Sequence, residues 1–282
     1  MSNLSAKVGR HHRVEWQAKD PENILVHARF DELKGTYRKS GRDQARGQEK
    51  YDRAKKLYDL EAAIELVDEL SRHEIVEELV TAVLAADKPC RVVFPHPEFD
   101  SDYPNDVDKP VTNALPFAFA SHLAVELGGE IETNIIECAR PGRTKLNKFP
   151  RFLWQPKFEG EIDKSCVYVI VDDNCTLGGT FAMLRSYIVE NGGTVIAVCA
   201  LTTPQGRTCK FGIADSTVDV LKMNYGEEIS PLWKEEIGHD IRCLTENEGS
   251  FLANWEGQCA GDSQLSFVSL RDRLGKAKTQ GK

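Results

Sequence analysis

The sequence predicts an α/β fold, a doubly wound and mostly parallel sheet with helices on its faces. Residues 166–171 and 194–201 are short apolar runs of the kind that form strands buried on both faces. Between them, residues 181–188 carry apolar side chains at helical spacing, and the glycines 192–193 then stop the helix. Strand, helix and strand in that order imply parallel strands joined by a right-handed crossover.

The alternation of strand and helix extends upstream. Residues 90–94 form a β-branched run that ends at a proline, which predicts a strand. Residues 113–127 are apolar and end at two glycines, as a helix does, and residues 130–138 predict the next strand. Residues 74–86 predict a further helix. An amphipathic helix before it is predicted from the spacing of Leu57, Leu60, Ile64, Val67 and Leu70.

Three regions follow from these patterns. Residues 1–88 are expected to form a polar arm and a helical N-terminal region, with residues 1 to about 48 as a weakly ordered arm or a small subdomain. Residues 89–210 are expected to form the α/β core. Residues 211–282 are expected to form a C-terminal helical region that ends in a solvated tail. Within it, residues 245–248 have the pattern of a capping box, which predicts the start of a helix.

Composition excludes several classes of protein. The formal net charge of −8 does not attract phosphate backbones, so we expect no nucleic-acid partner. No apolar run approaches 18 residues and the first residues lack the apolar centre of a secretory signal, so we expect a cytoplasmic protein without a membrane partner. The eight cysteines include no CxxC pair, which favours buried thiols over disulfides or zinc.

The stretch VIVDDNCTLGGT, residues 169–180, holds the candidate site. Asp172 and Asp173 end a buried strand, and like charges crowded there cost free energy unless something binds. Gly178 and Gly179 let the backbone approach a ligand, and the turn opens into a helix whose first amides lack partners, which suits a phosphate monoester. Two carboxylates can accept hydrogen bonds from two vicinal hydroxyls. A diol with a phosphate indicates ribose 5-phosphate.

These residues resemble the signature of the type I phosphoribosyltransferases, and the resemblance covers about residues 91–203. It implies that Asp172 and Asp173 hold the ribose hydroxyls of phosphoribosyl pyrophosphate. Its 5-phosphate would be bound by Thr176, Leu177, Gly178, Gly179 and Thr180. The chain departs from the family at Asn174 and Cys175, which are usually apolar, and at Leu177, which is usually small and polar. Thr176 stands where enzymes of 6-oxopurine salvage carry an aspartate, which disfavours that substrate class.

The resemblance also implies a leaving-group site with Mg²⁺ as cofactor. The pyrophosphate loop would be Pro95, His96, Pro97 and Glu98, and the metal would lie near Asp172 and Asp173, through ribose or water, and near Asp100 and Asp102. The basic residues 140–151 suit a flexible catalytic loop that neutralises departing pyrophosphate, with Arg143, Lys145 and Lys148 as catalytic candidates. For the pyrophosphate loop, the plainer alternative is a surface loop rich in turn-forming residues. For residues 140–151, it is a solvated basic segment.

The leading hypothesis is therefore a pentosyltransferase that moves ribose 5-phosphate to a small-molecule acceptor, a nitrogenous base, with release of pyrophosphate. The resemblance further implies a hood over the core, built by N-terminal helices, C-terminal helices or both, and a homodimer. One alternative is a regulator that senses phosphoribosyl pyrophosphate or a nucleotide without turnover, since fold does not fix function. Another is an interaction protein with a vestigial site.

Overall fold

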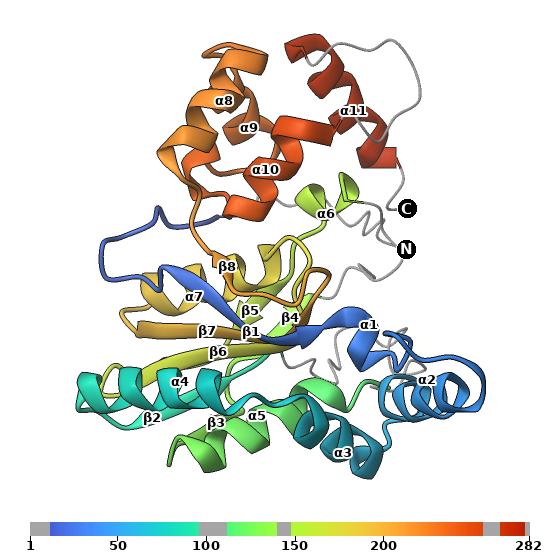
Figure 1. The fold of residues 1–282 in the computed structure, drawn as a ribbon. Helices are drawn as coiled ribbons and strands as arrows, with labels where there is room; N and C mark the ends of the chain where they lie inside the picture. Colours follow the sequence, from blue (N-terminus) through green and yellow to red (C-terminus); the bar gives the residue numbers. More distant parts are fainter. Residues whose placement is uncertain (1–11, 96–111, 140–147, 256–265, 280–282) are drawn as a thin grey trace, which may run out of the picture.

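A computed structural model describes residues 12–95, 112–139, 148–255 and 266–279. Its centre is a six-stranded sheet in the order β3-β2-β6-β7-β1-β8 (Figure 1). The strands are β1 (Asn23–Arg29), β2 (Cys90–Val93), β3 (Glu130–Glu132), β6 (Val167–Asn174), β7 (Thr194–Thr203) and β8 (Cys209–Lys210). All neighbouring pairs are parallel except β8, which runs antiparallel to β1. The predicted α/β class with a mostly parallel sheet is confirmed.

Helices cover both faces of this sheet. On one face pack α3 (Leu60–Leu70), α4 (His73–Ala86) and α5 (Leu115–Glu126). On the other pack α7 (Gly179–Glu190) and a small antiparallel sheet of β4 (Ile136–Ala139) and β5 (Lys157–Glu159). Short α1 (Phe30–Leu33) and the longer α2 (Gly41–Lys56) follow β1 along the chain. The N-terminal helices α3 and α4 therefore form a layer of the core, where the sequence analysis allowed them a place in a hood.

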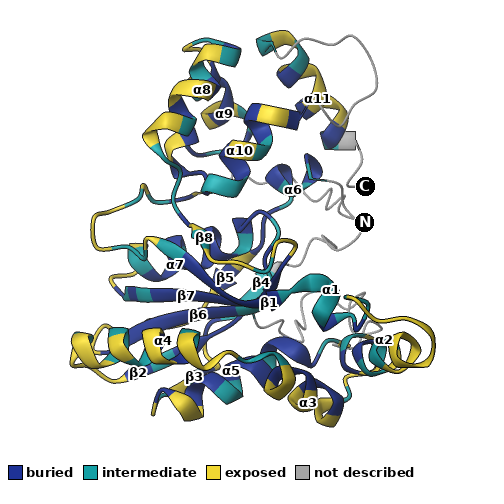
Figure 2. Cartoon of the chain, viewed as in Figure 1, coloured by how far each residue is buried: buried dark blue, intermediate teal, exposed yellow. Residues whose placement is uncertain are grey.

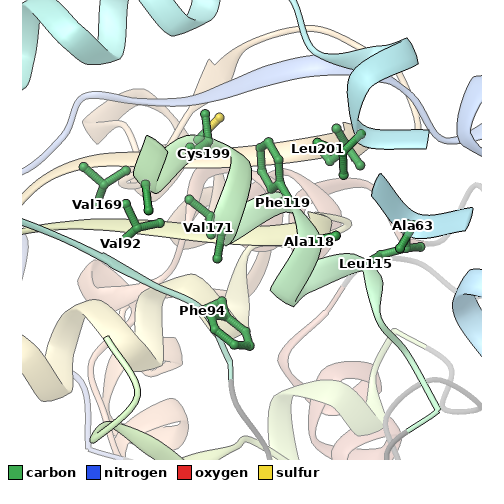
Figure 3. Close-up of a cluster of buried hydrophobic side chains, with 14 of the residues drawn as sticks. Ala63, Val92, Phe94, Leu115, Ala118, Phe119, Val169, Val171, Cys199 and Leu201 are labelled. Atoms are coloured by element: carbon green, nitrogen blue, oxygen red, sulfur yellow. The ribbon is translucent and has the colours of Figure 1, made fainter. Parts of the chain in front are cut away.

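The strand β6 shows why its sequence is apolar throughout. Val167, Val169 and Val171 belong to the cluster shared with α3, α4 and α5, whereas Tyr168 and Ile170 belong to the cluster shared with α7. Successive side chains of a strand alternate between faces, so a strand covered on both sides has no polar face. Figure 3 shows Phe119 of α5 beside Val171, Cys199 and Leu201. Figure 2 shows the exposed positions gathered on the outer sides of the helices.

A separate group of helices, built mostly from the C-terminal part of the chain, packs around its own core. It consists of α6 (Pro150–Leu153), α8 (Asp215–Tyr225), α9 (Ile229–Glu236), the 3₁₀ helix Ile241–Cys243, α10 (Glu246–Asn254) and α11 (Phe267–Thr279). These helices share their own apolar cluster, in which Phe152 packs edge-to-face on Trp233. The predicted capping box is present: Thr245 caps α10 and Glu248 bonds back to the Thr245 amide. None of the helices in the described ranges has both the length and the apolar character needed to cross a membrane.

Several predicted elements differ from the structure. Residues 23–29, assigned to a weakly ordered arm or a small subdomain, form β1 inside the sheet, so the N-terminal region contributes to the core. The predicted amphipathic helix begins only at Leu60, because Tyr58 has φ 53°, and Leu57 is 73% exposed. The strand predicted over residues 130–138 is divided between β3 and β4. The region assigned to a solvated tail is largely α11.

One buried histidine explains how β1 tolerates a polar residue. His27 is fully buried, and its Nδ1 accepts a hydrogen bond of 2.8 Å from the Arg72 amide. Burial, aided by the nearby His122 and Arg72, lowers the pKa of His27 to about 4. The imidazole is therefore neutral near pH 7 and carries its proton on Nε2, which is buried with no hydrogen-bond partner among the described residues, and its ring packs edge-to-face with Phe119.

The burial of α11 gives a stability prediction. Leu274 is 1% exposed against the helical cluster and Val268 is 76% exposed on the same helix. We expect Leu274→Ala to lower the free energy of unfolding by about 2–5 kcal/mol, because it leaves a cavity. Val268→Ala should change it by less than about 0.5 kcal/mol. Urea unfolding followed by tryptophan fluorescence measures both, and equal, small effects would mean that α11 does not pack as described.

Candidate functional site

The candidate site lies where the chain changes direction in the sheet. From β2 the chain crosses through α5 to β3 on one side, whereas β6 leads through α7 to β7 on the other side. The helices α5 and α7 lie on opposite faces. In open parallel sheets such a switch point leaves a crevice beyond the carboxyl ends of the strands. Asp172 and Asp173 are at the carboxyl end of β6, next to this point.

Asp173 is held by side chains from two other segments. Its Oδ2 accepts a short hydrogen bond from Lys55 Nζ and a second bond of 3.1 Å from Asn113 Nδ2. Lys55 belongs to the last turn of α2, and Asn113 lies just before α5. The Asp173 side chain is 8% exposed and that of Lys55 is 26% exposed. A buried carboxylate of the site therefore has an internal counter-ion.

Asp172 differs from its neighbour in exposure and in hydrogen bonding. It is partly exposed, and its Oδ1 accepts a 2.8 Å bond from the Asp173 amide. Thr202, at the end of β7, donates a 2.9 Å bond to the Asp173 carbonyl and fixes the backbone there. Of the two carboxyl residues, Asp172 is the more exposed.

The surroundings shift the pKa values of the two carboxyls in opposite directions. Loss of solvent, followed by the charge of Asp173, raises the pKa of Asp172 well above its usual value. Burial alone would also raise the pKa of Asp173, but the Lys55 ammonium and the hydrogen bonds from Lys55 and Asn113 outweigh it and lower that pKa. Burial works against the charge of Lys55, yet Asp173 raises the lysine pKa, so the ammonium persists. With Asp172 protonated, the three groups sum to zero charge.

This balance corrects the argument made from the sequence. From the sequence alone, two adjacent carboxylates predict a bound ligand that relieves their repulsion. Here the chain itself relieves the repulsion, because Lys55 neutralises one carboxylate and burial disfavours the charged form of the other. A ligand remains compatible with the pair, but the pair alone does not demand one.

The turn after the pair is packed against the C-terminal helices. Leu177 is 8% exposed within their apolar cluster, and its carbonyl accepts a short hydrogen bond from Thr245 Oγ1. Gly178 begins α7 with φ 81°, a conformation that favours glycine. The turn thus packs against α10 through Leu177, whereas Thr176 and Thr180 are partly exposed to solvent.

A buried ion pair lies behind this turn. Arg13 forms a two-pronged contact with Glu248, with Nη1 to Oε2 at 2.6 Å and Nη2 to Oε1 at 2.9 Å, and both side chains are 1% exposed. A methyl group on Gly179 would come within 2.7 Å of Glu248 Oε1 and 3.2 Å of Arg13 Nη2. The glycine is therefore required by packing in the protein, independently of any phosphate.

Of the remaining predicted site residues, Pro95 and Lys148 lie within the described ranges. Pro95 follows β2, and its peptide bond is trans, since no cis bond occurs in the described ranges. Lys148 places Nζ 5.0 Å from the centre of the Phe251 ring. The other members of the loops lie outside the described residues: His96, Pro97, Glu98, Asp100, Asp102, Arg143 and Lys145. The structure brings together Asp172, Asp173 and the turn, and places Lys148 on the C-terminal helical unit.

Sequence reasoning missed Lys55, Asn113 and the Arg13–Glu248 pair. Lys55 is one of several cations on α2, and nothing in its spacing marks it. A usable signal existed at Thr202, a polar residue that ends an apolar strand beside Asp173. Within the described ranges, no group of three or more His, Cys, Asp and Glu side chains could hold a metal ion.

Comparison with known proteins gives distant likenesses. No family model matches the chain. It is 32% identical over 227 residues to Protein TraN of Escherichia coli, a stretch that covers 80% of this chain and 46% of that protein. It is 32% identical over 78 residues to an uncharacterized protein of Haemophilus influenzae, covering 28% of this chain and 17% of that protein. The chain thus spans less than half of each curated relative, and neither relative's name states an activity.

Among solved structures, one likeness is to the adenine phosphoribosyltransferase of Leishmania donovani. Sequence identity is 15%, the match covers 51% of this chain and 70% of that chain, and the TM-score is 0.28. A likeness at this level carries no argument about function.

The unequal environments of the two aspartates predict opposite mutational effects. Asp173→Asn should lower the free energy of unfolding by about 3 kcal/mol, the low end for a broken buried ion pair, because Lys55 is partly exposed. Asp172→Asn should be neutral or stabilising, because a raised pKa means that ionisation of Asp172 disfavours the folded state.

The pH dependence of these variants follows from the same shifts. Stability from Asp173 is present above its unfolded pKa and is lost as the pH falls through its lowered folded pKa. Stability from Asp172 is present below its unfolded pKa and is lost as the pH rises through its raised folded pKa, so any gain in Asp172→Asn should grow with pH. Urea unfolding between pH 4 and about 8 measures both, and equal losses in the two variants would contradict the assignment.

Gly179 provides a steric test of the turn. Gly179→Ala should cost about 1–3 kcal/mol of unfolding free energy, because the buried Arg13–Glu248 pair has to move. Gly275→Ala is the matched control, since Gly275 lies within α11 with no atom near its added methyl group. It should stabilise the protein by about 0.5–1 kcal/mol through helix propensity. Thermal and urea unfolding of both variants decide whether the turn is packed as described.

Proposed function

We propose that the chain binds phosphoribosyl pyrophosphate at the carboxyl edge of its sheet and transfers the ribose 5-phosphate to a nitrogenous base. The observation that carries this proposal is the position of the acidic pair, at the switch point and directly before the turn that opens α7. A diol-binding group and a phosphate-binding turn are then adjacent in space, as a ribose 5-phosphate requires.

The roles of the residues follow from their exposure. Asp172, the more accessible carboxyl, would bond to a ribose hydroxyl, and Asp173 would hold Asp172 and Lys55 in place. The 5-phosphate would be bound by the first amides of α7 and by the hydroxyls of Thr176 and Thr180. The turn packs on α10 through Leu177 and Thr245, so the C-terminal helices are the part proposed as the hood.

The transfer step needs little covalent help from the protein. An acceptor nitrogen would attack the anomeric carbon while pyrophosphate leaves, through a transition state that resembles an oxocarbenium ion. Lys148 and the loop residues Arg143 and Lys145 would compensate the charge of the leaving group, and Mg²⁺ would accompany the diphosphate. A cytoplasmic homodimer belongs to the same proposal.

The internal charge balance favours a second candidate, a sensor that binds the same ligand without turnover. An oxocarbenium-like transition state gains most from uncompensated negative charge near the anomeric carbon. Here Lys55 already neutralises Asp173, and burial raises the pKa of Asp172, which disfavours its charged form. Such a site suits binding of a polyanion in its ground state.

Calorimetry with phosphoribosyl pyrophosphate, with and without Mg²⁺, tests the proposal. We expect the native chain to bind and Asp172→Asn to bind at least about 10-fold more weakly. Hydroxyl donors of the ligand would favour the ionised form of Asp172, and the amide cannot make the resulting charge-assisted hydrogen bond. Asp219→Asn, the same change on the exposed surface of α8, should bind as the native chain does. Pyrophosphate release in a screen of nitrogenous bases then separates a transferase from a sensor. Absence of binding by the native chain would overturn both.

A further inference from the structure

The position of Lys55 is fixed by the backbone around it. The Ala54 carbonyl accepts a 2.9 Å bond from the Ala114 amide, and the Tyr58 amide donates a 2.8 Å bond to the Thr112 carbonyl. The end of α2 and the segment before α5 are thereby tied side by side. These two backbone bonds make Lys55 and Asn113 neighbours, and both side chains donate to the same oxygen of Asp173. The contact is part of the fold and not a chance approach of a long surface side chain.

Two of the four carboxyl oxygens of the acidic pair accept hydrogen bonds from the chain itself. Asp173 Oδ2 takes an ammonium and an amide, and Asp172 Oδ1 takes the Asp173 amide. Mg²⁺ demands near-octahedral oxygen ligands at about 2.0–2.1 Å and is repelled by an adjacent ammonium. The ammonium bonded to Asp173 and the two occupied oxygens make the pair a poor holder of Mg²⁺, so the magnesium expected near Asp172 and Asp173 does not fit the residues present there.

We propose that Lys55 takes the place of a divalent cation at the acidic pair, so that an anionic ligand meets a protein ammonium group here and not a metal held by Asp172 and Asp173. The identity of that ligand rests on the proposed function, whereas the replacement of the metal does not. The Lys55 side chain is 26% exposed, and an ammonium has three donor protons, of which Asp173 takes one. The remaining donors are available to a phosphate oxygen.

Binding of Mn²⁺, followed by electron paramagnetic resonance, tests the replacement directly. The native chain should show no Mn²⁺ site that depends on Asp173. Lys55→Met should gain such a site, at least about 10-fold tighter than any in the native chain, because it frees a buried carboxylate that needs a counter-ion. The gain should disappear in Lys55→Met/Asp173→Asn, and Lys55→Arg, which keeps the charge, should not show it.

Two results of the Mn²⁺ experiment would overturn the proposal. One is a native site that Asp173→Asn removes. The other is a folded Lys55→Met variant, verified by circular dichroism, that gains no site. If Lys55→Met does not fold, native and Asp172→Asn proteins decide, because a metal held by the pair would be weakened by loss of the Asp172 charge. Identical Mn²⁺ binding by these two proteins supports the proposal, and weaker binding by Asp172→Asn opposes it.

Calorimetry with phosphoribosyl pyrophosphate separates this inference from the proposed function. If the function holds, Lys55→Met should weaken binding at least about 10-fold in the presence of Mg²⁺, and Lys55→Arg should stay within about 3-fold of the native chain. Equal affinity of the native and Lys55→Met proteins would oppose a contact between Lys55 and the ligand. If the native chain does not bind this ligand, the proposed function fails, and the Mn²⁺ result still decides whether Lys55 replaces the metal.

Discussion

The ion pair between Lys55 and Asp173 is the contact on which the organisation of the site depends. A carboxylate at the end of a central, doubly covered strand is costly to bury without a partner. Lys55 supplies that partner from α2, an element distant in sequence, and so joins the N-terminal helices to the centre of the sheet. Because the charge is balanced inside the chain, the carboxyl edge of β6 can be stable with no ligand bound.

A second buried pair, Arg13 with Glu248, determines the geometry of the neighbouring turn. Glu248 both closes the capping box of α10 and lies against Gly179, so the start of α10 and the start of α7 are built around one carboxylate. The N-terminal segment is tied down further where Arg185 of α7 contacts Asp20 and the Val14 carbonyl. Movement of the C-terminal helices would therefore displace the turn at the start of α7.

The sequence predicted the elements whose signal is local. The strands around residues 90–94, 166–171 and 194–201 and the helices α4, α5 and α7 follow from apolar periodicity and from glycine stops. The strand β1 was missed because its apolar run is short and contains His27, whose neutrality depends on burial and on the Arg72 amide from a later helix. α11 was missed because only Leu270, Leu274 and Ala277 face inward among many charges. Lys55 was missed because ion-pair partners 118 residues apart leave no pattern in sequence.

The charge state of Asp172 connects the two functional candidates. With Asp172 protonated, the acidic pair and Lys55 are neutral, and the site favours an anionic ligand over a transition state that gains positive charge. With Asp172 ionised, the same three groups carry one net negative charge beside the place proposed for the ribose, and a cationic transition state gains the stabilisation that the ground state does not need. A ligand that brings hydroxyl donors or cations to Asp172 lowers its pKa by stabilising the ionised form. Binding and turnover would then differ by one proton, and the same fold could serve as a sensor or as a transferase according to how well its ligand removes that proton.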